Sequence, residues 1–353
     1  MRIAVDVMGG DHAPDAIVKG CLDALPLLGE SDSLVLVGDR AVVEDIASER
    51  GIDAGSHPKI ELIHAPMNIE MHESPVDAVR AKPESSLVRM ALLGSSRKTK
   101  DPVDVVISAG NTGACVSAAT MYMKRLRGVH RPGIACTIPA LHGPVVVSDV
   151  GANPEPRASH QAQYGIMAAV YAEHVLGIKN PRVAQMNIGS EEGKGTGMIK
   201  QVREMLQRVP DLNYVGYIEG RDLFEGAADV VVTDGFVGNT MLKLTEGLAK
   251  SLFKAIVHEV MAVDTNLAMQ VQAALGGLMK RNDYHEYGGA PLLGVNGNCF
   301  ICHGSSEART MKAAIRVARD HVNRNVNAAI LARLERLKEL GFEAVGGEDS
   351  EAA

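Results

Sequence analysis

Aromatic side chains and an excess of basic charge are both missing from this 353-residue sequence. Phe, Trp and Tyr make up 3% of the residues, Trp is absent, and the formal net charge is −7. Proteins that bind nucleic acids generally carry surplus positive charge and aromatic rings on which bases stack. The composition therefore disfavours a nucleic-acid-binding protein.

Cysteine is also scarce, and no long apolar run is present. The five cysteines are an odd number in a long chain, which argues against the disulfide framework of a secreted protein. Residues 1–6 lack the apolar core of a signal peptide, and no uncharged apolar run reaches the roughly 18 residues that span a bilayer. We expect a protein of the reducing cytoplasm whose contact with membrane, if any, is peripheral.

What is present is the composition of an ordered globular protein. Hydrophobic residues make up 46% and charged residues 22% of the chain, and short β-branched runs alternate with longer helical stretches. This alternation predicts parallel strands joined by crossover helices, in a single two-lobed α/β domain of residues 1–345 followed by a disordered acidic tail at 346–353. The predicted strands are Ile3–Val7, Leu34–Val37, Ile60–His64, Val105–Ser108, Val145–Val150, Arg182–Asn187, Tyr214–Ile218, Val230–Thr233 and Cys299–His303.

Residues 240–281 follow a different pattern, which predicts a helical hairpin. Apolar residues recur at near-helical spacing from Leu244 to Val260, the pattern breaks near Asp264, and it resumes from Leu267. The first interpretation of such a stripe is packing in a core or a dimer interface. The alternative is a surface hairpin that dips apolar residues into lipid headgroups.

Turns that combine glycine with small polar residues follow most of the predicted strands. They occupy 6–12, 108–113, 149–153, 187–195, 236–239 and 303–306. Ligands of open parallel sheets collect beyond the carboxyl ends of the strands, where glycine and helix N-termini bring N–H groups close to an anion. Each turn alone is typical of a helix cap, but together they predict a phosphate site at one sheet edge.

Familiar cofactor motifs do not account for these turns. The run from Gly189 to Lys194 has neither the spacing nor the Ser or Thr of a P-loop, and no dinucleotide-binding spacing occurs. Cys299–His303 matches the haem-attachment string C-x-x-C-H, but haem attachment requires export, and no second Cys or His pair stands at zinc-finger spacing. We expect no metal and no organic cofactor.

Read in order, the turns resemble those of the bacterial phosphate acyltransferases of the PlsX type. The matching segments are MGGDHAP at 8–14, ISAGNTGA at 107–114, DVGAN at 149–153, NIG at 187–189, DGFVGN at 234–239, YGGAPLLG at 287–294 and CHGSS at 302–306. These segments extend over almost the whole chain.

The resemblance implies a fold, a reaction and partners. The implied fold is a three-layer α/β/α sandwich with a mostly parallel central sheet, similar to phosphotransacetylases and isopropylmalate dehydrogenases. The implied reaction moves a fatty acyl group from acyl carrier protein to inorganic phosphate and yields acyl phosphate for phospholipid synthesis. The resemblance also implies a cytoplasmic homodimer at the inner face of the cell membrane, beside the glycerol-3-phosphate acyltransferase that consumes acyl phosphate.

The chemistry of that reaction suggests roles for individual residues. Phosphate is already a nucleophile near neutral pH, so the protein must supply approximation and oriented donors rather than a Ser-His-Asp relay. We expect Lys194 and His303 to be catalytic, as a cation beside the phosphate and a donor near the leaving sulfur. The residues expected to bind phosphate or acyl groups are Gly10, Asp11, Asn111, Thr112, Gly113, Asn153, Asn239, Ser305 and Ser306.

Simpler interpretations of these two residues stay open. Lys194 could be a solvated surface charge, and His303 could be a histidine whose hydrogen bonds are satisfied at a strand end.

Two other functions also stay open. One is a phosphotransacetylase-like enzyme that uses acyl-CoA, and the other is a non-catalytic, membrane-associated scaffold of lipid enzymes.

Two local features distinguish these functions. An acidic carrier protein needs a basic docking surface, for which the candidates are Arg80, Lys82, Lys124, Arg125, Arg127 and Arg131. A membrane contact is expected where the helical stripe is interrupted, at Met261, Val263, Leu267, Met269 and Val271, and packing in a dimer core is the alternative there.

Overall fold

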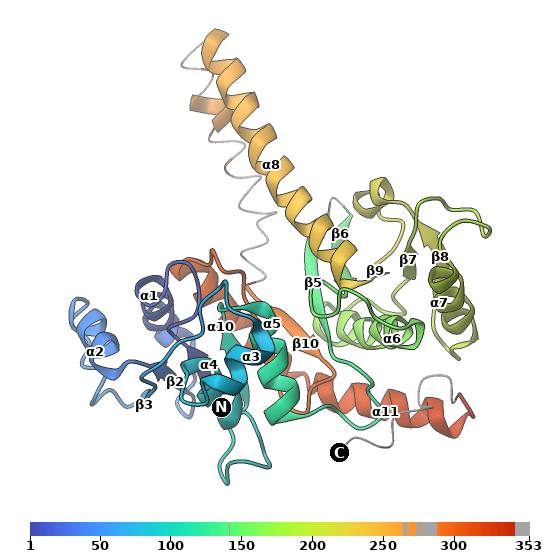
Figure 1. Ribbon diagram of the computed structural model, residues 1–353. Helices are drawn as coiled ribbons and strands as arrows, with labels where there is room; N and C mark the ends of the chain where they lie inside the picture. The colour runs from blue at the N-terminus through green and yellow to red at the C-terminus, as the bar shows by residue number, and fades with distance from the viewer. Residues whose placement is uncertain (141, 264–266, 268, 273–275, 277–287, 343–353) are drawn as a thin grey trace.

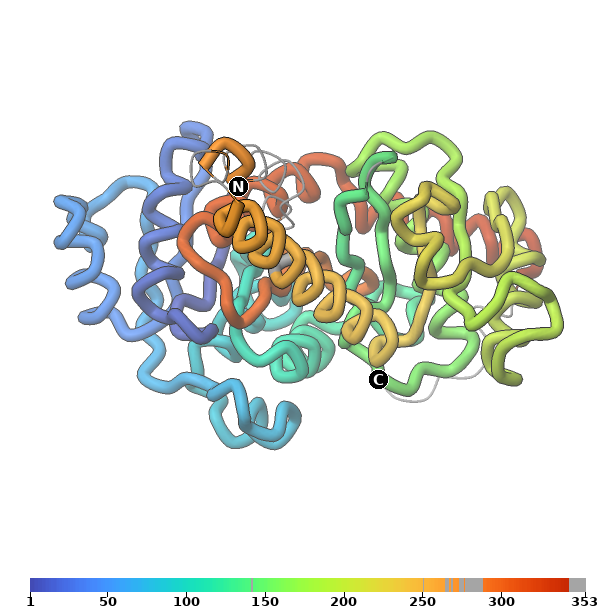
Figure 2. The backbone as a smooth tube through the Cα atoms, turned by 90° about the horizontal axis from the view of Figure 1, so that it is seen from above, coloured from blue at the N-terminus to red at the C-terminus, as the bar shows by residue number. Residues whose placement is uncertain are grey.

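The computed structural model describes residues 1–140, 142–263, 267, 269–272, 276 and 288–342, and it forms two lobes that lie side by side (Figures 1 and 2). The strands are β1 Arg2–Asp6, β2 Ser33–Gly38, β3 Ile60–His64, β4 Val105–Ser108, β5 Gly133–Ala140, β6 Gly143–Ser148, β7 Val183–Met186, β8 Tyr214–Ile218, β9 Val230–Val232, β10 Ala290–Leu293 and β11 Cys299–Ile301. The α-helices are α1 Asp15–Ala24, α2 Arg40–Ser48, α3 Pro75–Ala81, α4 Ser86–Leu93, α5 Thr112–Ala118, α6 Ala158–Val175, α7 Gly197–Arg208, α8 Gly235–Val263, α10 Ala308–Asn323 and α11 Val326–Glu339. Short helical turns are η1 Leu25–Leu27, η2 Ala119–Met123 and η3 Gly220–Phe224.

The described strands form one 11-stranded sheet in the order β3-β2-β1-β4-β11-β10-β5-β6-β9-β7-β8. The first five of these run parallel to one another, as do the last four. The pairs β11–β10, β10–β5 and β5–β6 in the middle are antiparallel. Three reversals in a row mean that the two parallel halves run in opposite directions.

Side chains alternate between two hydrophobic layers because successive strand residues point to opposite faces. On β1, Ile3 and Val5 pack with α1 and α10, whereas Ala4 packs with α4 and α5 on the other face. In the second lobe, Val230 and Val232 pack with α6, α7 and α11, while Val231 belongs to the layer of the opposite face. Helices thus cover both faces, which confirms the predicted α/β/α sandwich.

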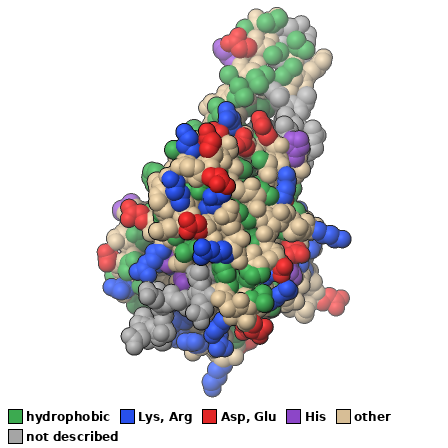
Figure 3. All heavy atoms as spheres, turned by 90° about the vertical axis from the view of Figure 1, so that its right-hand side faces the viewer, with side chains coloured by type: hydrophobic (Ala, Val, Ile, Leu, Met, Phe, Trp, Pro, Cys, Tyr) green, Lys and Arg blue, Asp and Glu red, His purple; other side chains and the backbone are tan. Residues whose placement is uncertain are grey.

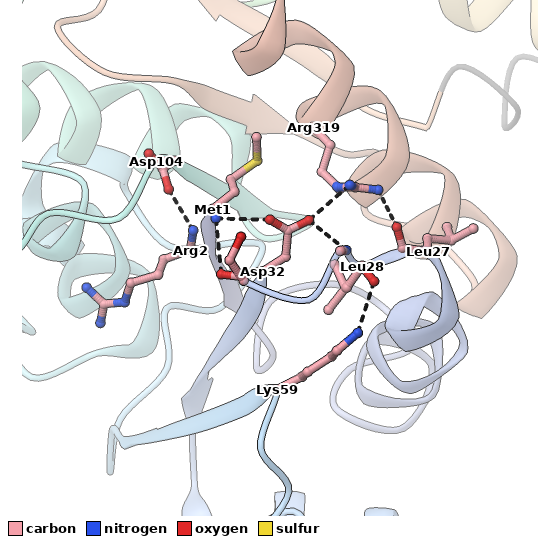
Figure 4. Close-up of polar contacts among 10 residues, drawn as sticks. Met1, Arg2, Leu27, Leu28, Asp32, Lys59, Asp104 and Arg319 are labelled. Carbon is pink, nitrogen blue, oxygen red and sulfur yellow. Dashed lines mark hydrogen bonds and ion pairs between the residues drawn. The ribbon is translucent and has the colours of Figure 1, made fainter.

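A cluster of hydrogen bonds and ion pairs around Asp32 links Met1 to helix α10 (Figure 4). The carboxylate of Asp32 accepts from the Met1 ammonium over 3.0 Å and from the Gly29 N–H over 2.9 Å, and lies 2.9 Å from the Arg319 guanidinium. Burial alone would raise the pKa of Asp32, but these partners hold it below the ordinary value. These contacts join β1, the turn before β2 and α10 at the base of the first lobe.

All nine strands predicted from the sequence are present, with ends shifted by two residues or fewer. The prediction missed β5 and β10, both of which are the antiparallel members of the sheet centre. Both contain proline and alanine, which are depleted in strands. Their pairing with distant strands, rather than their local pattern, places them in the sheet.

Helix α8 carries the stripe that marked the predicted hairpin, and it stands away from the two lobes (Figure 1). It begins at Gly235, earlier than expected, and ends at Val263, where the sequence pattern breaks. Leu244, Leu248 and Leu252 are more than half exposed. Within the described residues, no helix is long and apolar enough to cross a membrane. The predicted tail at 346–353 lies outside the described residues.

A buried histidine gives the first lobe a pH-dependent stability. His321 of α10 packs between the rings of Tyr171 and Phe300, at centroid distances of 5.9 Å and 5.1 Å, and burial lowers its pKa to about 4. Between pH 6.5 and about 4, His321 is therefore protonated in the unfolded chain but neutral in the folded chain.

We predict that this histidine weakens the fold by about 3 kcal/mol as the pH falls from 7 to 4. In His321→Gln the group that titrates is absent, so the free energy of unfolding should lose this part of its pH dependence. Urea unfolding at pH 7 and pH 4.5 measures both proteins, and His174→Ala on an exposed position of α6 is the control. A pH dependence identical in His321→Gln and the wild type would contradict the prediction.

Candidate active site

A cleft of about 300 Å³ lies between the two halves of the sheet. The first half contributes Asp11 after β1, Thr112 after β4, and His303 after β11. The second half contributes Gly151 after β6, and helix α8 contributes Asn239. The cleft thus gathers several of the polar turns that the sequence singled out.

The prediction that all six turns share one sheet edge is wrong. The turns after β1, β4 and β11 follow strands of one direction, and the turns after β6, β7 and β9 follow strands of the opposite direction. The reversal at the sheet centre, which the sequence pattern did not reveal, is the reason. The cleft forms where the two sets of turns approach each other between the lobes.

On the first side of the cleft, a buried carboxylate holds two turns together. Asp6 is 1% exposed and accepts from Ser108 Oγ over 2.8 Å and from the Met8 N–H over 3.2 Å. A Cβ on Gly9 would lie 2.6 Å from Asp6 Oδ2 and 2.8 Å from the Cα of Gly110, so only glycine permits this approach. Burial raises the pKa of Asp6, and hydroxyl donors oppose the shift.

His303 and Ser305 form a local pair at the end of β11. The Ser305 N–H donates to His303 Nδ1 over 3.2 Å, and Ser305 Oγ lies 2.8 Å from the same nitrogen. Because Nδ1 accepts the backbone N–H, the proton of the neutral ring sits on Nε2. The arrangement leaves Nε2 as a donor for a ligand in the cleft.

On the second side, Asp149 orders the turn after β6. It accepts from the Ile134 N–H over 2.9 Å and from the Asn153 N–H over 2.6 Å, and burial raises its pKa to about 6 while those N–H groups oppose the shift. A Cβ on Gly238 would lie 2.0 Å from the Asp149 carbonyl oxygen. The start of α8 can therefore pack against this turn only through glycine.

Apolar side chains form one wall of the cleft. They come from β5, from the turn after β6, from α8 and from β11, and are Ile134, Cys136, Val150, Leu242 and Ile301. Burial raises the pKa of the Cys136 thiol to about 12, so this cysteine is apolar lining rather than a nucleophile. The cleft combines an apolar wall with a polar rim of histidine, threonine and asparagine.

Asn111, expected to hold phosphate, uses its side chain within the protein. Its Oδ1 accepts from the Ala114 N–H over 3.0 Å and caps α5, while its Nδ2 faces the carbonyl oxygens of Glu70, Met71 and Glu73 at 3.1–3.4 Å. Asn111 therefore positions the loop before α3 and the start of α5. Thr112, the next residue, lines the cleft in its place.

Several other expected residues lie beside the cleft rather than in it. Asn153 donates to the Pro132 carbonyl over 2.7 Å and, with Gly113, lines a neighbouring cavity. Ser306 is fully buried, with no partner for its Oγ among the described residues. Gly10 adopts a φ of 124° in the turn after β1 and precedes the cleft-lining Asp11.

The two expected catalytic residues do not meet in the cleft. Lys194 is exposed on the loop after β7 and is not among the residues that line the cleft. Lys243 and Glu246 of α8 do line it, together with Thr137 of β5, whose buried Oγ1 has no described partner. The sequence analysis missed these three residues because it interpreted α8 as a helix that packs in a core or an interface, and because it did not predict β5 as a strand.

The expected docking residues differ in availability. Arg80, Lys124, Arg127 and Arg131 are exposed, and Arg125 is half-buried with its guanidinium on the His130 carbonyl. Lys82 instead pairs with Glu73 at 2.5 Å and donates to the Asn68 carbonyl. Lys82 is therefore bound within the protein.

The expected membrane residues lie at the outer end of α8 and beyond it. Met261, Val263, Leu267 and Met269 are 46–83% exposed, and Val271 is half-buried. Figure 3 shows hydrophobic side chains along the projecting helix, with charged groups between them. In the single chain, these residues do not form a core.

Comparison with known proteins identifies the relatives of this chain. The family model described as "Fatty acid synthesis protein" matches residues 1–329. The phosphate acyltransferase of Dictyoglomus turgidum is 41% identical over 345 residues, which cover 97% of this chain and 100% of that protein. The phosphate acyltransferase of Heliobacterium modesticaldum is 44% identical over 332 residues, covering 94% and 96%.

Solved structures with the same fold include two phosphotransacetylases. The Streptococcus pyogenes protein superposes with a TM-score of 0.59 at 14% identity, covering 96% of this chain and 94% of that one. The Staphylococcus aureus EutD protein superposes with a TM-score of 0.56 at 14% identity, covering 91% and 94%. At this identity the similarity establishes the fold.

We predict that Asn111→Ala destabilises the protein by about 2–3 kcal/mol, because a helix cap and buried hydrogen bonds are lost together. Asn111→Asp keeps the capping oxygen but not the donor, so it should fall between alanine and the wild type. Urea unfolding near pH 7 measures the three proteins. If Asn111→Ala is as stable as the wild type and loses only phosphate affinity, the side chain binds ligand after all.

Proposed function

Since this chain belongs to the phosphate acyltransferase family, it is an enzyme that joins an acyl group to phosphate, and we propose that its donor is a fatty acyl thioester of acyl carrier protein. The observation that carries this proposal is the cleft, in which an apolar wall adjoins polar donors. An acyl chain suits the wall, and phosphate suits the donors.

The proposed reaction needs one nucleophile, one oxyanion and one leaving group. A phosphate oxygen attacks the thioester carbonyl carbon, the C–S bond breaks as the new C–O bond is completed, and the pantetheine thiolate takes the proton that hydrogenphosphate gives up. The products are acyl phosphate and the free thiol of the carrier. No electron transfer is involved, and no group outside the two substrates is consumed.

The residues proposed for this step surround the cleft from both sides. His303 Nε2 would donate to the developing oxyanion or to the leaving sulfur, and Thr112 and Asn239 would orient phosphate. Lys243 supplies a cation on the cleft wall, and Lys194, which lies outside the cleft on the exposed loop after β7, would be a second cation that meets the incoming phosphate. Ser305 holds the His303 ring through Nδ1.

The same proposal includes a cellular setting. Acyl phosphate made from a fatty chain is an amphiphile, and a membrane glycerol-3-phosphate acyltransferase would use it for phospholipid synthesis. The exposed apolar residues of α8 support peripheral attachment to a membrane, and the proposal places the protein, as a homodimer, at the inner, cytoplasmic face of that membrane.

We predict that purified protein converts palmitoyl-acyl carrier protein and labelled phosphate to a labelled product that hydroxylamine destroys. His303→Ala should lower kcat about 100-fold, the cost of losing one transition-state donor, and Lys194→Ala should raise the KM for phosphate about tenfold. His174→Ala is the matched histidine control, because it is exposed on α6.

The outcomes separate the competing functions. Faster turnover of palmitoyl-CoA than of the carrier-bound chain would indicate a phosphotransacetylase-like enzyme, and no product from any donor would leave a non-catalytic scaffold. Wild-type rates in folded His303→Ala or Lys194→Ala protein would remove that residue from the mechanism.

We predict that Met261→Glu combined with Val263→Glu abolishes sedimentation with anionic vesicles while the dimer and its activity in detergent persist. Each apolar Å² withdrawn from water contributes about 25 cal/mol, so two carboxylates at this end of α8 remove a weak attachment. Val42→Glu, on an exposed position of α2, is the control for added charge. Loss of the dimer or of the fold would show instead that these residues pack in an interface.

A further inference from the structure

A second cavity, of about 400 Å³, lies on the other side of the backbone segments that line the cleft. Thr112 and Gly151 face the cleft, whereas their neighbours Gly113 and Ala152 line this second cavity. A third cavity of about 370 Å³ continues it, because both include Arg131, Ala152 and Asn153. The cleft and the connected pair of cavities therefore adjoin at residues 112–113 and 151–152.

These two cavities are basic, although the chain has a net charge of −7. Arg125 and Arg131 line the first, Arg131 and Arg157 line the second, and Glu155 is the one carboxylate among the residues that line either. Arg131 and Arg157 are exposed, and no ion pair of either is found within the described part of the chain. Among the described residues that line these cavities, arginines outnumber carboxylates, so the surface suits an anionic group from outside.

Hydrogen bonds hold this basic surface in shape. The Arg125 guanidinium donates to the His130 carbonyl, and the His130 N–H donates to Gln163 Oε1 over 2.8 Å. Gln163 Nε2 in turn donates to the Gly128 carbonyl over 2.7 Å. The loop that precedes Arg131 is thereby fixed to α6, so the backbone position of Arg131 is set before a ligand binds.

From these arginines the first cavity extends along one face of α5 and η2. Gly113, Val116, Ser117 and Thr120 line it at helical spacing, so this face is about 10 Å long. It mixes apolar carbons with hydroxyl groups and contains no charged side chain. Such a groove fits a slender chain of methylenes and amides that ends in an anion.

We propose that these cavities bind the phosphopantetheine arm of the acyl donor, with the phosphate ester on Arg131 and Arg157 and the arm along α5. The inference rests on the proposed function, in which the donor is a carrier-bound thioester. The guanidinium group matches phosphate oxygens in a bidentate manner, which a surface lysine cannot do. The thioester end would reach the cleft past the first turn of α5, where Thr112 follows the capping Asn111.

The test compares two small donors that differ only in the phosphate: palmitoyl-phosphopantetheine and palmitoyl-pantetheine. For the wild type, kcat/KM should be about 100-fold higher with the phosphate-bearing donor. Arg131→Ala and Arg157→Ala should each reduce that ratio about tenfold, and Arg131→Lys should keep part of it. Arg208→Ala, an exposed arginine of α7, is the matched control and should keep the wild-type ratio.

A substitution that removes a negative charge, rather than a positive one, tests whether electrostatic attraction holds the phosphate ester. Glu155→Gln removes the carboxylate of the cavity, so the ratio should rise about threefold. An unchanged ratio in Arg131→Ala, Arg157→Ala and Glu155→Gln overturns the proposal, as does an equal loss with both donors. A loss seen only with intact carrier protein also overturns it, since the arginines would then contact the protein. If no donor yields acyl phosphate in the wild type, the proposed function itself fails.

Discussion

The cleft depends on two carboxylates that the fold buries and must therefore supply with hydrogen bonds. Asp6 ends β1 and Asp149 follows β6, one in each half of the sheet, and each is at most 1% exposed. A carboxylate away from water is stable only when N–H and O–H groups surround it. The donors include the Met8 and Asn153 N–H groups, which belong to the turns after β1 and β6 that reach the cleft, so satisfying the buried charge also orders the site.

The second constraint is the reversal of strand direction at the sheet centre. A uniformly parallel sheet collects its ligand-binding turns along one edge. In this protein β10, β5 and β6 each run antiparallel to a neighbour, so the turns of the two halves approach a ligand from different lobes. The apolar wall comes largely from strands of this central region, including Ile134 and Cys136 of β5. The feature that divides the sheet thus also supplies the surface that suits an acyl chain.

Helix α8 connects the cleft with the outer surface of the molecule. The helix projects from the body of the molecule (Figure 1), and its first turns contribute Asn239, Leu242 and Lys243 to the cleft, while its later turns expose Leu248 and Leu252. Glycine at positions 235 and 238 allows the start of the helix to pack against the turn after β6. One element therefore serves the site at one end and an exposed apolar stripe at the other.

The sequence alone determined the alternation of strands and helices, the nine strands that carry β-branched residues and the polar character of the turns, because those features follow from local periodicity and turn chemistry. Only the tertiary structure decided which polar side chains are available to a ligand. Asn111 and Asn153 were expected to be donors to a ligand, yet the fold uses them to cap α5 and to hold Pro132, whereas Lys243, which the sequence analysis did not single out, lines the cleft. Hydrogen bonds between residues far apart in the chain, and the direction of strands with weak local signals, depend on contacts that no local pattern records.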